Sequence, residues 1–135
     1  MAKKVSSNDS LSMDSGKKEY KGKKLRVAII GCGGICQVHM DAYAKIPEVE
    51  IVAACDILPE RLKVMKEKWG VEAGYADWKK MLKEVKPDAV DICTPNGVHM
   101  QPAVDAANAG CHVMVEKPMA MNPAECEKMI AAAKK

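Results

Sequence analysis

The chain has 135 residues, of which 48% are hydrophobic and 29% are charged, and its formal net charge at pH 7 is +3. This composition is typical of one globular domain, and it excludes collagen-like, coiled-coil and wholly disordered proteins. The apolar runs are too short to cross a membrane, and no apolar stretch follows the amino-terminal lysines. We therefore expect neither a membrane segment nor a secretory signal.

The positive charge is concentrated at the amino terminus. Residues 1–24 hold seven lysines against three acidic residues, so this segment carries +4 and the rest of the chain carries −1. The rest of the chain has no excess of basic residues, which argues against nucleic-acid binding. We expect residues 1–23 to be a disordered polar leader, with a membrane- or RNA-binding arm as the less favoured alternative. Residues 24–135 then form the folded domain.

Apolar, strand-like runs alternate with helical patterns after this leader. In chain order, the patterns predict strands at 25–30, 50–55, 72–75, 89–93 and 112–115, and helices at 35–46, 59–69, 77–85, 97–108 and from 122 onward. This alternation predicts an α/β fold in which helices cover both faces of a parallel sheet. For a doubly wound sheet of five strands, we expect the strand order 3-2-1-4-5.

The chain contains six cysteines: Cys32, Cys36, Cys55, Cys93, Cys111 and Cys126. An even count is compatible with a disulfide framework, but three of these cysteines adjoin apolar strand-like runs. Cys32 and Cys36 are separated by three residues, and no Cys-x2-Cys pair lies near to complete a zinc site. We expect buried thiols in a reducing, cytoplasmic compartment and no metal site.

A glycine-rich turn, Gly31-Cys32-Gly33-Gly34-Ile35-Cys36, joins the first predicted strand to the first predicted helix. In a dinucleotide-binding turn, the first glycine permits the tight turn, and the second lets the backbone approach a pyrophosphate at the helix amino terminus. The third position is usually glycine or alanine, and Cys36 occupies it here. Because sulfur is only modestly bulkier than a methyl group, we expect a slight shift rather than loss of binding.

Asp56 follows the second predicted strand, 20 residues after Cys36. A carboxylate at this position accepts hydrogen bonds from the ribose hydroxyls of an adenosine and repels a 2′-phosphate. The pattern therefore favours NAD as the cofactor, while the nearby Arg61 keeps NADP possible. The alternative is that Asp56 only begins a turn before Pro59.

Thr94-Pro95-Asn96 follows the fourth predicted strand, with Gly97 and His99 close behind. In the order 3-2-1-4-5, strands one and four are neighbours, and ligands bind in the crevice between their carboxyl ends. These residues would line that crevice opposite the glycine turn. An ordinary turn with a capping asparagine fits the spacing equally well, and His99 alone is more typical of a structural histidine.

Glu116-Lys117-Pro118 follows the fifth predicted strand. A lysine at the carboxyl end of a central strand points toward the crevice, where its ammonium group would hold a substrate hydroxyl and stabilise an alkoxide. Pro118 can fix this turn, including through a cis peptide bond. From the sequence pattern alone, a solvated lysine at a strand end is the simpler interpretation.

These four motifs, in this order, resemble the amino-terminal half of the glucose–fructose oxidoreductase / inositol dehydrogenase / MocA (Gfo/Idh/MocA) family. The resemblance extends from about Lys24 to Ala133, and it rests on segments 26–35, 55–56, 91–96 and 110–118 together with His39 and His99. It implies an NAD(P)-binding Rossmann domain and the oxidation of a secondary alcohol on a sugar, cyclitol or related polyol.

The resemblance also assigns roles to single residues. It implies that Lys117 is the catalytic residue that reaches the reacting hydroxyl, and that Glu116 helps to place the nicotinamide. The predicted cofactor-binding residues are then Gly31, Gly33, Gly34, Ile35, Asp56, Thr94, Pro95, Asn96, His99 and Glu116.

Members of this family continue into a sixth strand and a second α/β domain, which supplies substrate contacts and the subunit interface. We expect the chain to lack that domain, to bind NAD weakly on its own, and to meet a sugar or polyol substrate only together with it. We expect the full-length form to be a homo-oligomer. One alternative is a stand-alone nucleotide-binding or redox-sensing module, in which Cys32 or Cys36 is a reactive thiol. A weaker alternative is a subunit that a separate chain completes.

Overall fold

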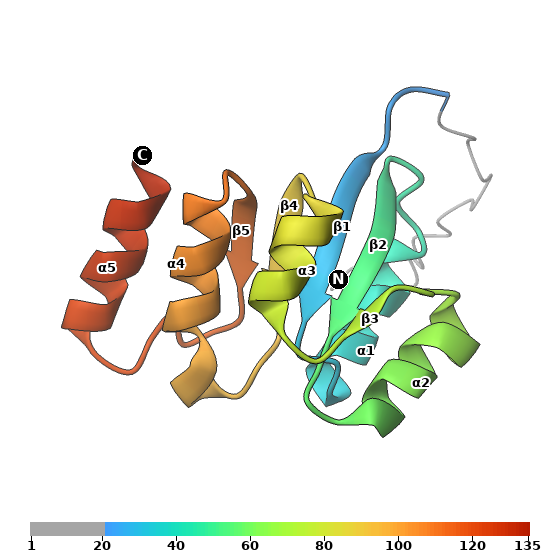
Figure 1. The fold of residues 1–135 in the computed structure, drawn as a ribbon, viewed down its shortest axis with the longest axis horizontal. Coiled ribbons are helices and arrows are strands. Elements are labelled where there is room, and N and C mark those ends of the chain that lie inside the picture. Colours follow the sequence, from blue (N-terminus) through green and yellow to red (C-terminus); the bar gives the residue numbers. More distant parts are fainter. Residues whose placement is uncertain (1–20) are drawn as a thin grey trace, which may run out of the picture.

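Five parallel strands form the centre of residues 21–135, the part of the chain that this computed structural model describes (Figure 1). The strands are β1 (Leu25–Ile30), β2 (Val49–Cys55), β3 (Gly74–Tyr75), β4 (Ala89–Ile92) and β5 (His112–Val115). Their order in the sheet is β3-β2-β1-β4-β5, as the sequence predicts. The predicted leader comprises residues 1–23. Its residues 1–20 lie outside the described part of the chain.

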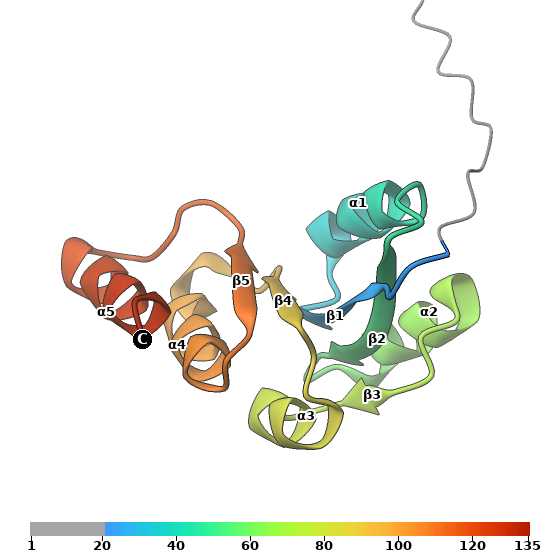
Figure 2. The same cartoon turned by 90° about the horizontal axis from the view of Figure 1, so that it is seen from above.

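Helices cover both faces of the sheet, as Figure 2 shows. One face carries α1 (Gly34–Tyr43) and α2 (Pro59–Trp69), and the other carries α3 (Trp78–Val85), α4 (Met100–Asn108) and α5 (Pro123–Ala133). α5 packs against α4 at the β5 side of the molecule. No helix of residues 21–135 combines the length and the apolar character that crossing a membrane requires.

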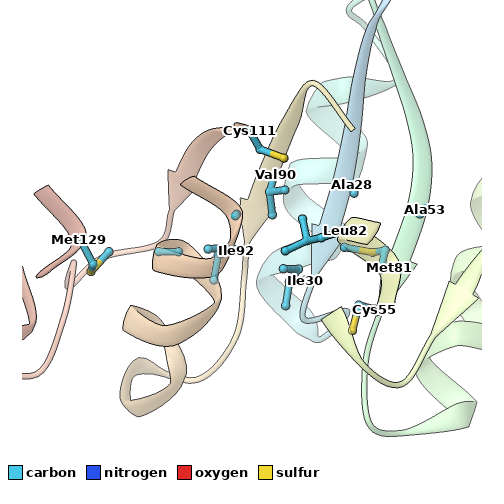
Figure 3. Close-up of a cluster of buried hydrophobic side chains, with 12 residues drawn as sticks. Ala28, Ile30, Ala53, Cys55, Met81, Leu82, Val90, Ile92, Cys111 and Met129 are labelled. Atoms are coloured by element: carbon cyan, nitrogen blue, oxygen red, sulfur yellow. The ribbon is translucent and has the colours of Figure 1, made fainter. Parts of the chain in front are cut away.

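The side chains of β1 alternate between the two faces. Ala28 and Ile30 join a buried cluster with side chains of α3, α4 and α5, part of which is drawn in Figure 3. Val27 and Ile29 join the opposite cluster, with side chains of α1 and α2. Because both faces are covered, both sets of positions are apolar, which is why the strand forms an unbroken apolar run in the sequence.

The register places the carboxyl ends of four strands side by side. Ile30 pairs with Cys55 of β2 and with Ile92 of β4, and Ile92 pairs with Val115 of β5. The residues that follow these four strands therefore meet at one end of the sheet, which we call the carboxyl end. Every predicted site motif follows one of these strands.

One predicted helix is interrupted, so its expected extent of 97–108 was wrong. Residues Asn96–Val98 form a short 3-10 helix (η1), and α4 begins only afterwards. Pro102 has no N–H group to donate to the Val98 carbonyl, and the Thr94 hydroxyl donates to this carbonyl instead, at 3.0 Å. The helical hydrogen-bond ladder is therefore broken at the point where the loop after β4 turns.

Two other boundaries differ from the prediction by two residues or more. α1 ends at Tyr43 instead of at residue 46, because the last residues before Pro47 form a tighter turn in which Ile46 N–H donates to the Tyr43 carbonyl at 2.9 Å. The third strand is reduced from 72–75 to the two residues Gly74–Tyr75. It pairs only with β2, at one side of the sheet.

Two predicted helix starts are confirmed by side-chain caps. Asp77 Oδ1 accepts a hydrogen bond from Lys79 N–H at 2.9 Å, at the start of α3. Asn122 Oδ1 accepts one from Glu125 N–H at 3.0 Å, and Pro123 is the first residue of α5. These caps satisfy amide groups that have no partner within the helix.

Candidate functional site

The glycine turn approaches the loop after β4 very closely at Gly31. Its φ is +90°, in the left-handed region that favours glycine. A Cβ atom on Gly31 would lie 2.6 Å from Thr94 N and 2.8 Å from the Cys93 carbonyl oxygen. Both the dihedral angle and the close approach therefore require glycine at this position.

The rest of the turn forms the beginning of α1, which Gly33 precedes. A Cβ atom on Gly34 would meet none of the described atoms within 4 Å, so this part of the turn is open. Among the described residues, no side chain caps the amino terminus of α1. Its first N–H groups are consequently available to an anionic ligand.

Asp56 lies at the end of β2 and fastens the glycine turn to that strand. The residue is only 7% exposed. Its Oδ2 accepts a hydrogen bond from Cys32 N–H at 2.8 Å, and its Oδ1 accepts one from Leu58 N–H at 2.9 Å. Arg61 Nη1 lies 3.4 Å from Oδ2. Asp56 therefore shapes the turn through main-chain contacts, whatever ligand it also binds.

A cavity of about 190 Å³ opens at the carboxyl end of the sheet. The residues that line it include Gly31, Asp56, Arg61, Thr94 and Pro95. The structure thus brings together three of the four predicted motifs, from the ends of β1, β2 and β4. A larger hollow of about 410 Å³ lies at the opposite end of the sheet. Ligands of doubly wound sheets bind at the carboxyl end, so the smaller cavity is the candidate site.

Cys32 and Cys36 are buried beneath the turn. Cys36 Sγ lies 3.9 Å from Met65 Sδ of α2, within the apolar cluster between these helices and the sheet. The neighbouring Cys36 and burial together raise the pKa of the Cys32 thiol. All six cysteines lie in the described residues and are free thiols, as the sequence predicts.

His99 joins the loop after β4 to the loop after β5. It is 1% exposed, with Nδ1 at 2.8 Å from the Pro118 carbonyl oxygen and Nε2 at 2.9 Å from the Thr94 carbonyl oxygen. Both partners are main-chain carbonyl oxygens, which accept hydrogen bonds from the ring. This burial favours the structural interpretation, in which His99 shapes the walls of the cavity.

Glu116 and Lys117 follow β5 at the same end of the sheet. Lys117 is exposed, and its main-chain N–H donates to Glu116 Oε2 at 3.3 Å. The other carboxylate oxygen, Oε1, lies 2.7 Å from His39 Nε2. The Lys117–Pro118 peptide bond is cis, an arrangement that the sequence analysis allowed for.

His39, on α1, connects Glu116 with a second carboxylate. Its Nδ1 lies 2.8 Å from Oδ2 of Asp91, a completely buried residue of β4. The hydroxyl of Tyr43 donates to the same oxygen at 3.0 Å. Burial lowers the pKa of His39, but the hydrogen bonds and charges of Asp91 and Glu116 outweigh it and raise the pKa above its ordinary value.

His39, Asp91 and Cys93 present one nitrogen, one oxygen and one sulfur atom within 4.8 Å of one another. A metal site would need Cys93 as a thiolate. Burial and the charge of Asp91 raise the pKa of this thiol instead, and its Sγ donates to Asp91 Oδ1 at 3.5 Å. The cluster therefore has the character of a hydrogen-bond network.

The sequence matches, over residues 25–135, the Gfo/Idh/MocA family model, which is described as an oxidoreductase family with an NAD-binding Rossmann fold. The matched segment contains the sheet and the five α-helices of residues 21–135. The chain belongs to the Gfo/Idh/MocA family. The resemblance carried by the four motifs is thus confirmed, and so is the predicted doubly wound fold of this Gfo/Idh/MocA domain.

Relatives of this Gfo/Idh/MocA chain include sugar and cyclitol dehydrogenases. It is 42% identical to D-glucoside 3-dehydrogenase of Escherichia coli (strain K12) over 112 residues, which cover 82% of this chain and 32% of the relative. It is 34% identical to myo-inositol 2-dehydrogenase of Thermotoga maritima over 111 residues, which cover 82% of this chain and 33% of the relative. The chain spans about a third of the length of these curated relatives.

The fold of the Gfo/Idh/MocA chain is also similar to solved structures. One is scyllo-inositol dehydrogenase from Lactobacillus casei with bound NAD(H) and scyllo-inositol, with a TM-score of 0.78, 32% identity, and coverage of 83% of this chain and 33% of that one. Another is the WlbA dehydrogenase from Bordetella pertussis in complex with NADH and UDP-GlcNAcA. Its TM-score is 0.79 and its sequence identity is 34%, and the match covers 83% of this chain and 34% of the WlbA chain.

The predicted site residues of this Gfo/Idh/MocA domain take different places at the carboxyl end. Gly31, Asp56, Thr94 and Pro95 share the cavity lining. The remaining ones lie around it: Gly33, Gly34 and Ile35 at the start of α1, Asn96 in η1, His99 beneath the loops, and Glu116 and Lys117 after β5.

No sequence pattern assigns a role to the network around His39. Its signal was present in the segment 89–93, where Asp91 interrupts an apolar run that is predicted to be a buried strand. A buried carboxylate needs donors to compensate for the loss of water. His39 and Tyr43 are four residues apart, which places both on one face of α1, and this face supplies the donors.

Proposed function

We propose that this domain binds NAD at the carboxyl end of its sheet. We propose further that the full-length protein transfers hydride between NAD(P) and a secondary alcohol of a sugar, cyclitol or related polyol. The main support is the convergence of Gly31, Asp56 and Thr94 on one cavity, with Lys117 at the same end of the sheet. The substrate class follows the names of the relatives, which act on D-glucosides and inositols. A stand-alone module is not favoured, since these relatives are dehydrogenases.

The groups at the cavity fit a dinucleotide. The open turn at Gly34 and the uncapped start of α1, which Gly33 precedes, suit the pyrophosphate, with Ile35 exposed in the first turn. Each oxygen of Asp56 keeps acceptor capacity beyond its main-chain contact, which suits the ribose hydroxyls. Arg61, beside that carboxylate, keeps NADP possible as the cofactor.

The facing wall and the reacting end come from β4 and β5. Thr94, Pro95 and Asn96 form the loop opposite the glycine turn, with His99 beneath it. When bound, the nicotinamide supplies the hydride acceptor or donor. The ammonium group of Lys117 would hold the alcohol oxygen and stabilise the negative charge that develops there. Glu116 accepts the Lys117 N–H and so fixes the main chain of the catalytic residue.

The proposal extends to the cellular location and the oligomeric state of the protein. We propose a cytoplasmic location, which the six free thiols support, because cysteines stay reduced in that compartment. We also propose that the full-length form is a homo-oligomer, and that substrate contacts come from the part of the protein beyond this domain. Neither nucleic acid nor a membrane is proposed as a partner.

Denaturation with NAD tests the binding proposal. A ligand that binds only the folded state raises the free energy of unfolding by RT ln(1 + [L]/Kd), which is about 2.7 kcal/mol at 100 times Kd. We expect NAD to stabilise the chain. We expect Asp56→Asn to reduce this stabilisation, because it removes the carboxylate that accepts hydrogen bonds from the ribose hydroxyls.

Asp41→Asn is the matched control, since Asp41 is exposed on α1 away from the turn. It should leave the stabilisation by NAD unchanged. If neither NAD nor NADP raises the free energy of unfolding of the wild-type chain, the binding proposal is wrong.

A further inference from the structure

Lys117 is bracketed by two residues that histidines hold from opposite sides. His39 Nε2 contacts the carboxylate of the preceding residue, Glu116, at 2.7 Å. His99 Nδ1 contacts the main-chain carbonyl of the following residue, Pro118, at 2.8 Å. The exposed Lys117 therefore projects from a segment that is fixed at both ends by side chains distant in sequence.

The two anchors differ in how firmly they are set. His99 is buried and contacts only main-chain carbonyls, so nothing on its partners titrates. His39 is partly exposed and contacts two carboxylates. Of these, Asp91 is shielded from water, whereas the side chain of Glu116 is 21% exposed.

The protonation state of His39 decides how many of its contacts are hydrogen bonds. An imidazolium donates from both nitrogens, so it bridges Asp91 and Glu116 at once. A neutral ring carries one N–H group. Asp91 keeps this hydrogen because it has no access to water, whereas water can solvate the Glu116 carboxylate. Loss of the Nε2 proton to solvent would then leave a lone pair facing Glu116 Oε1, and this contact would open.

We propose that His39 is a positioning residue that, as an imidazolium, ties Glu116 to buried Asp91 and thereby holds the main chain of Lys117, and that releases Glu116 when it loses its proton. The relevance to catalysis rests on the function proposed above for Lys117. Because His99 still holds Pro118, the released segment pivots at Glu116 and Lys117 and does not unfold.

The groups around the His39 ring come from three elements. Tyr43 and Cys36 lie on α1, Asp91 lies on β4 with Cys93 directly after it, and Glu116 follows β5. The two carboxylates bring the pKa of His39 above its ordinary value of 6.5, although burial opposes them. A raised folded-state pKa means that this stabilisation is complete below pH 6.5 and is lost as the pH rises through the raised value.

NMR spectroscopy of the 135-residue chain without nucleotide tests the proposal. We expect the amide resonances of Glu116 and Lys117 to shift with pH at the same midpoint as the ring resonances of His39. The amide of Met119, beyond the segment that His99 holds, should shift much less. In Glu116→Gln, which changes a partly exposed side chain, the His39 midpoint should move to lower pH because one carboxylate is gone.

His39→Gln keeps a donor but cannot titrate, so the pH response of the Lys117 amide should disappear. His112→Gln is the matched control, because His112 is exposed at the opposite end of β5, and it should leave this response unchanged. The proposal is wrong if the Lys117 response persists in His39→Gln, or if wild-type Lys117 does not respond while His39 titrates. If His39→Gln does not fold, two other results test the proposal. These are the agreement of the His39 and Lys117 midpoints in the wild-type chain and the shift of the His39 midpoint in Glu116→Gln. Since no nucleotide is used, a failure of NAD binding is a separate result.

Discussion

The carboxyl end of the sheet has two halves that are held in different ways. At the ends of β1 and β2, the glycine turn and Asp56 are joined by main-chain contacts, and the Asp56 carboxylate accepts N–H groups 2 and 24 residues away in sequence. At the ends of β4 and β5, side chains contact one another across 48 to 77 residues, from Tyr43 and His39 to Asp91 and Glu116.

This difference shows what each half can tolerate. The first half depends on the shape of the backbone, so an added atom disturbs it more than a lost charge does. The second half depends on charge compensation in a buried place, so a lost charge disturbs it while the backbone stays unchanged. A substitution that adds atoms and a substitution that removes only a charge should therefore affect the two halves differently.

Gly31→Ala should have the largest effect. The positive φ and the contact of 2.6 Å with Thr94 N leave no room for a methyl group. Strain and overpacking together should lower the free energy of unfolding by about 3 kcal/mol, and NAD should no longer stabilise the protein. Urea denaturation with and without NAD measures both quantities.

Gly34→Ala is the control for that substitution, because a Cβ there would meet none of the described atoms within 4 Å. It should change the free energy of unfolding by less than about 1 kcal/mol. If the free energy of unfolding fell equally in Gly31→Ala and Gly34→Ala, close approach at Gly31 would not set the shape of this half.

Asp91→Asn should have a smaller effect, about 2 kcal/mol, although the side chain keeps its size. The amide lacks the charge that His39 and Tyr43 compensate, and hydrogen bonds to charged groups contribute more than neutral ones do. Urea denaturation of Asp91→Asn and of the exposed Asp41→Asn gives the comparison. A neutral result for Asp91→Asn would mean that the β4–β5 half does not depend on this charge.

Cys36→Ala should have the smallest effect. Removal of Sγ leaves a small cavity against Met65, which should lower the free energy of unfolding by about 1 kcal/mol. Because this sulfur lies under the turn, the Kd for NAD should stay within about twofold, a change below about 0.4 kcal/mol. A large change of Kd, measured by calorimetry, would show that the third position of the turn acts on the ligand directly.

The two halves also differ in how well the sequence predicts them. The turn at Gly31 and the carboxylate at Asp56 lie at fixed distances within one strand–helix–strand unit, so their relation is local and visible as spacing. The role of His39 is not visible in this way. One partner, Asp91, lies within β4 and the other, Glu116, follows β5, and only the strand order brings both to its ring.

Particular elements show the same limit. The sequence pattern predicts one helix over 97–108, whereas in the structure the Thr94 hydroxyl donates to the Val98 carbonyl and the segment is divided into η1 and α4. The histidine in this segment, His99, was predicted to line the cofactor. In the structure its ring contacts the carbonyl oxygens of two loops, Thr94 and Pro118, which only the folded chain brings within 3 Å of it.

The strand order was inferred from the doubly wound class of fold, whereas the residues themselves predict the alternation of strands and helices, the need for glycine at the first turn and the helix caps at Asp77 and Asn122. These features follow from apolar periodicity and from the conformational limits of single residues, both of which are local. Only the tertiary structure decided which side chains meet at the carboxyl end. The reason is that a buried charge such as Asp91 must find its donors wherever the packed helices place them.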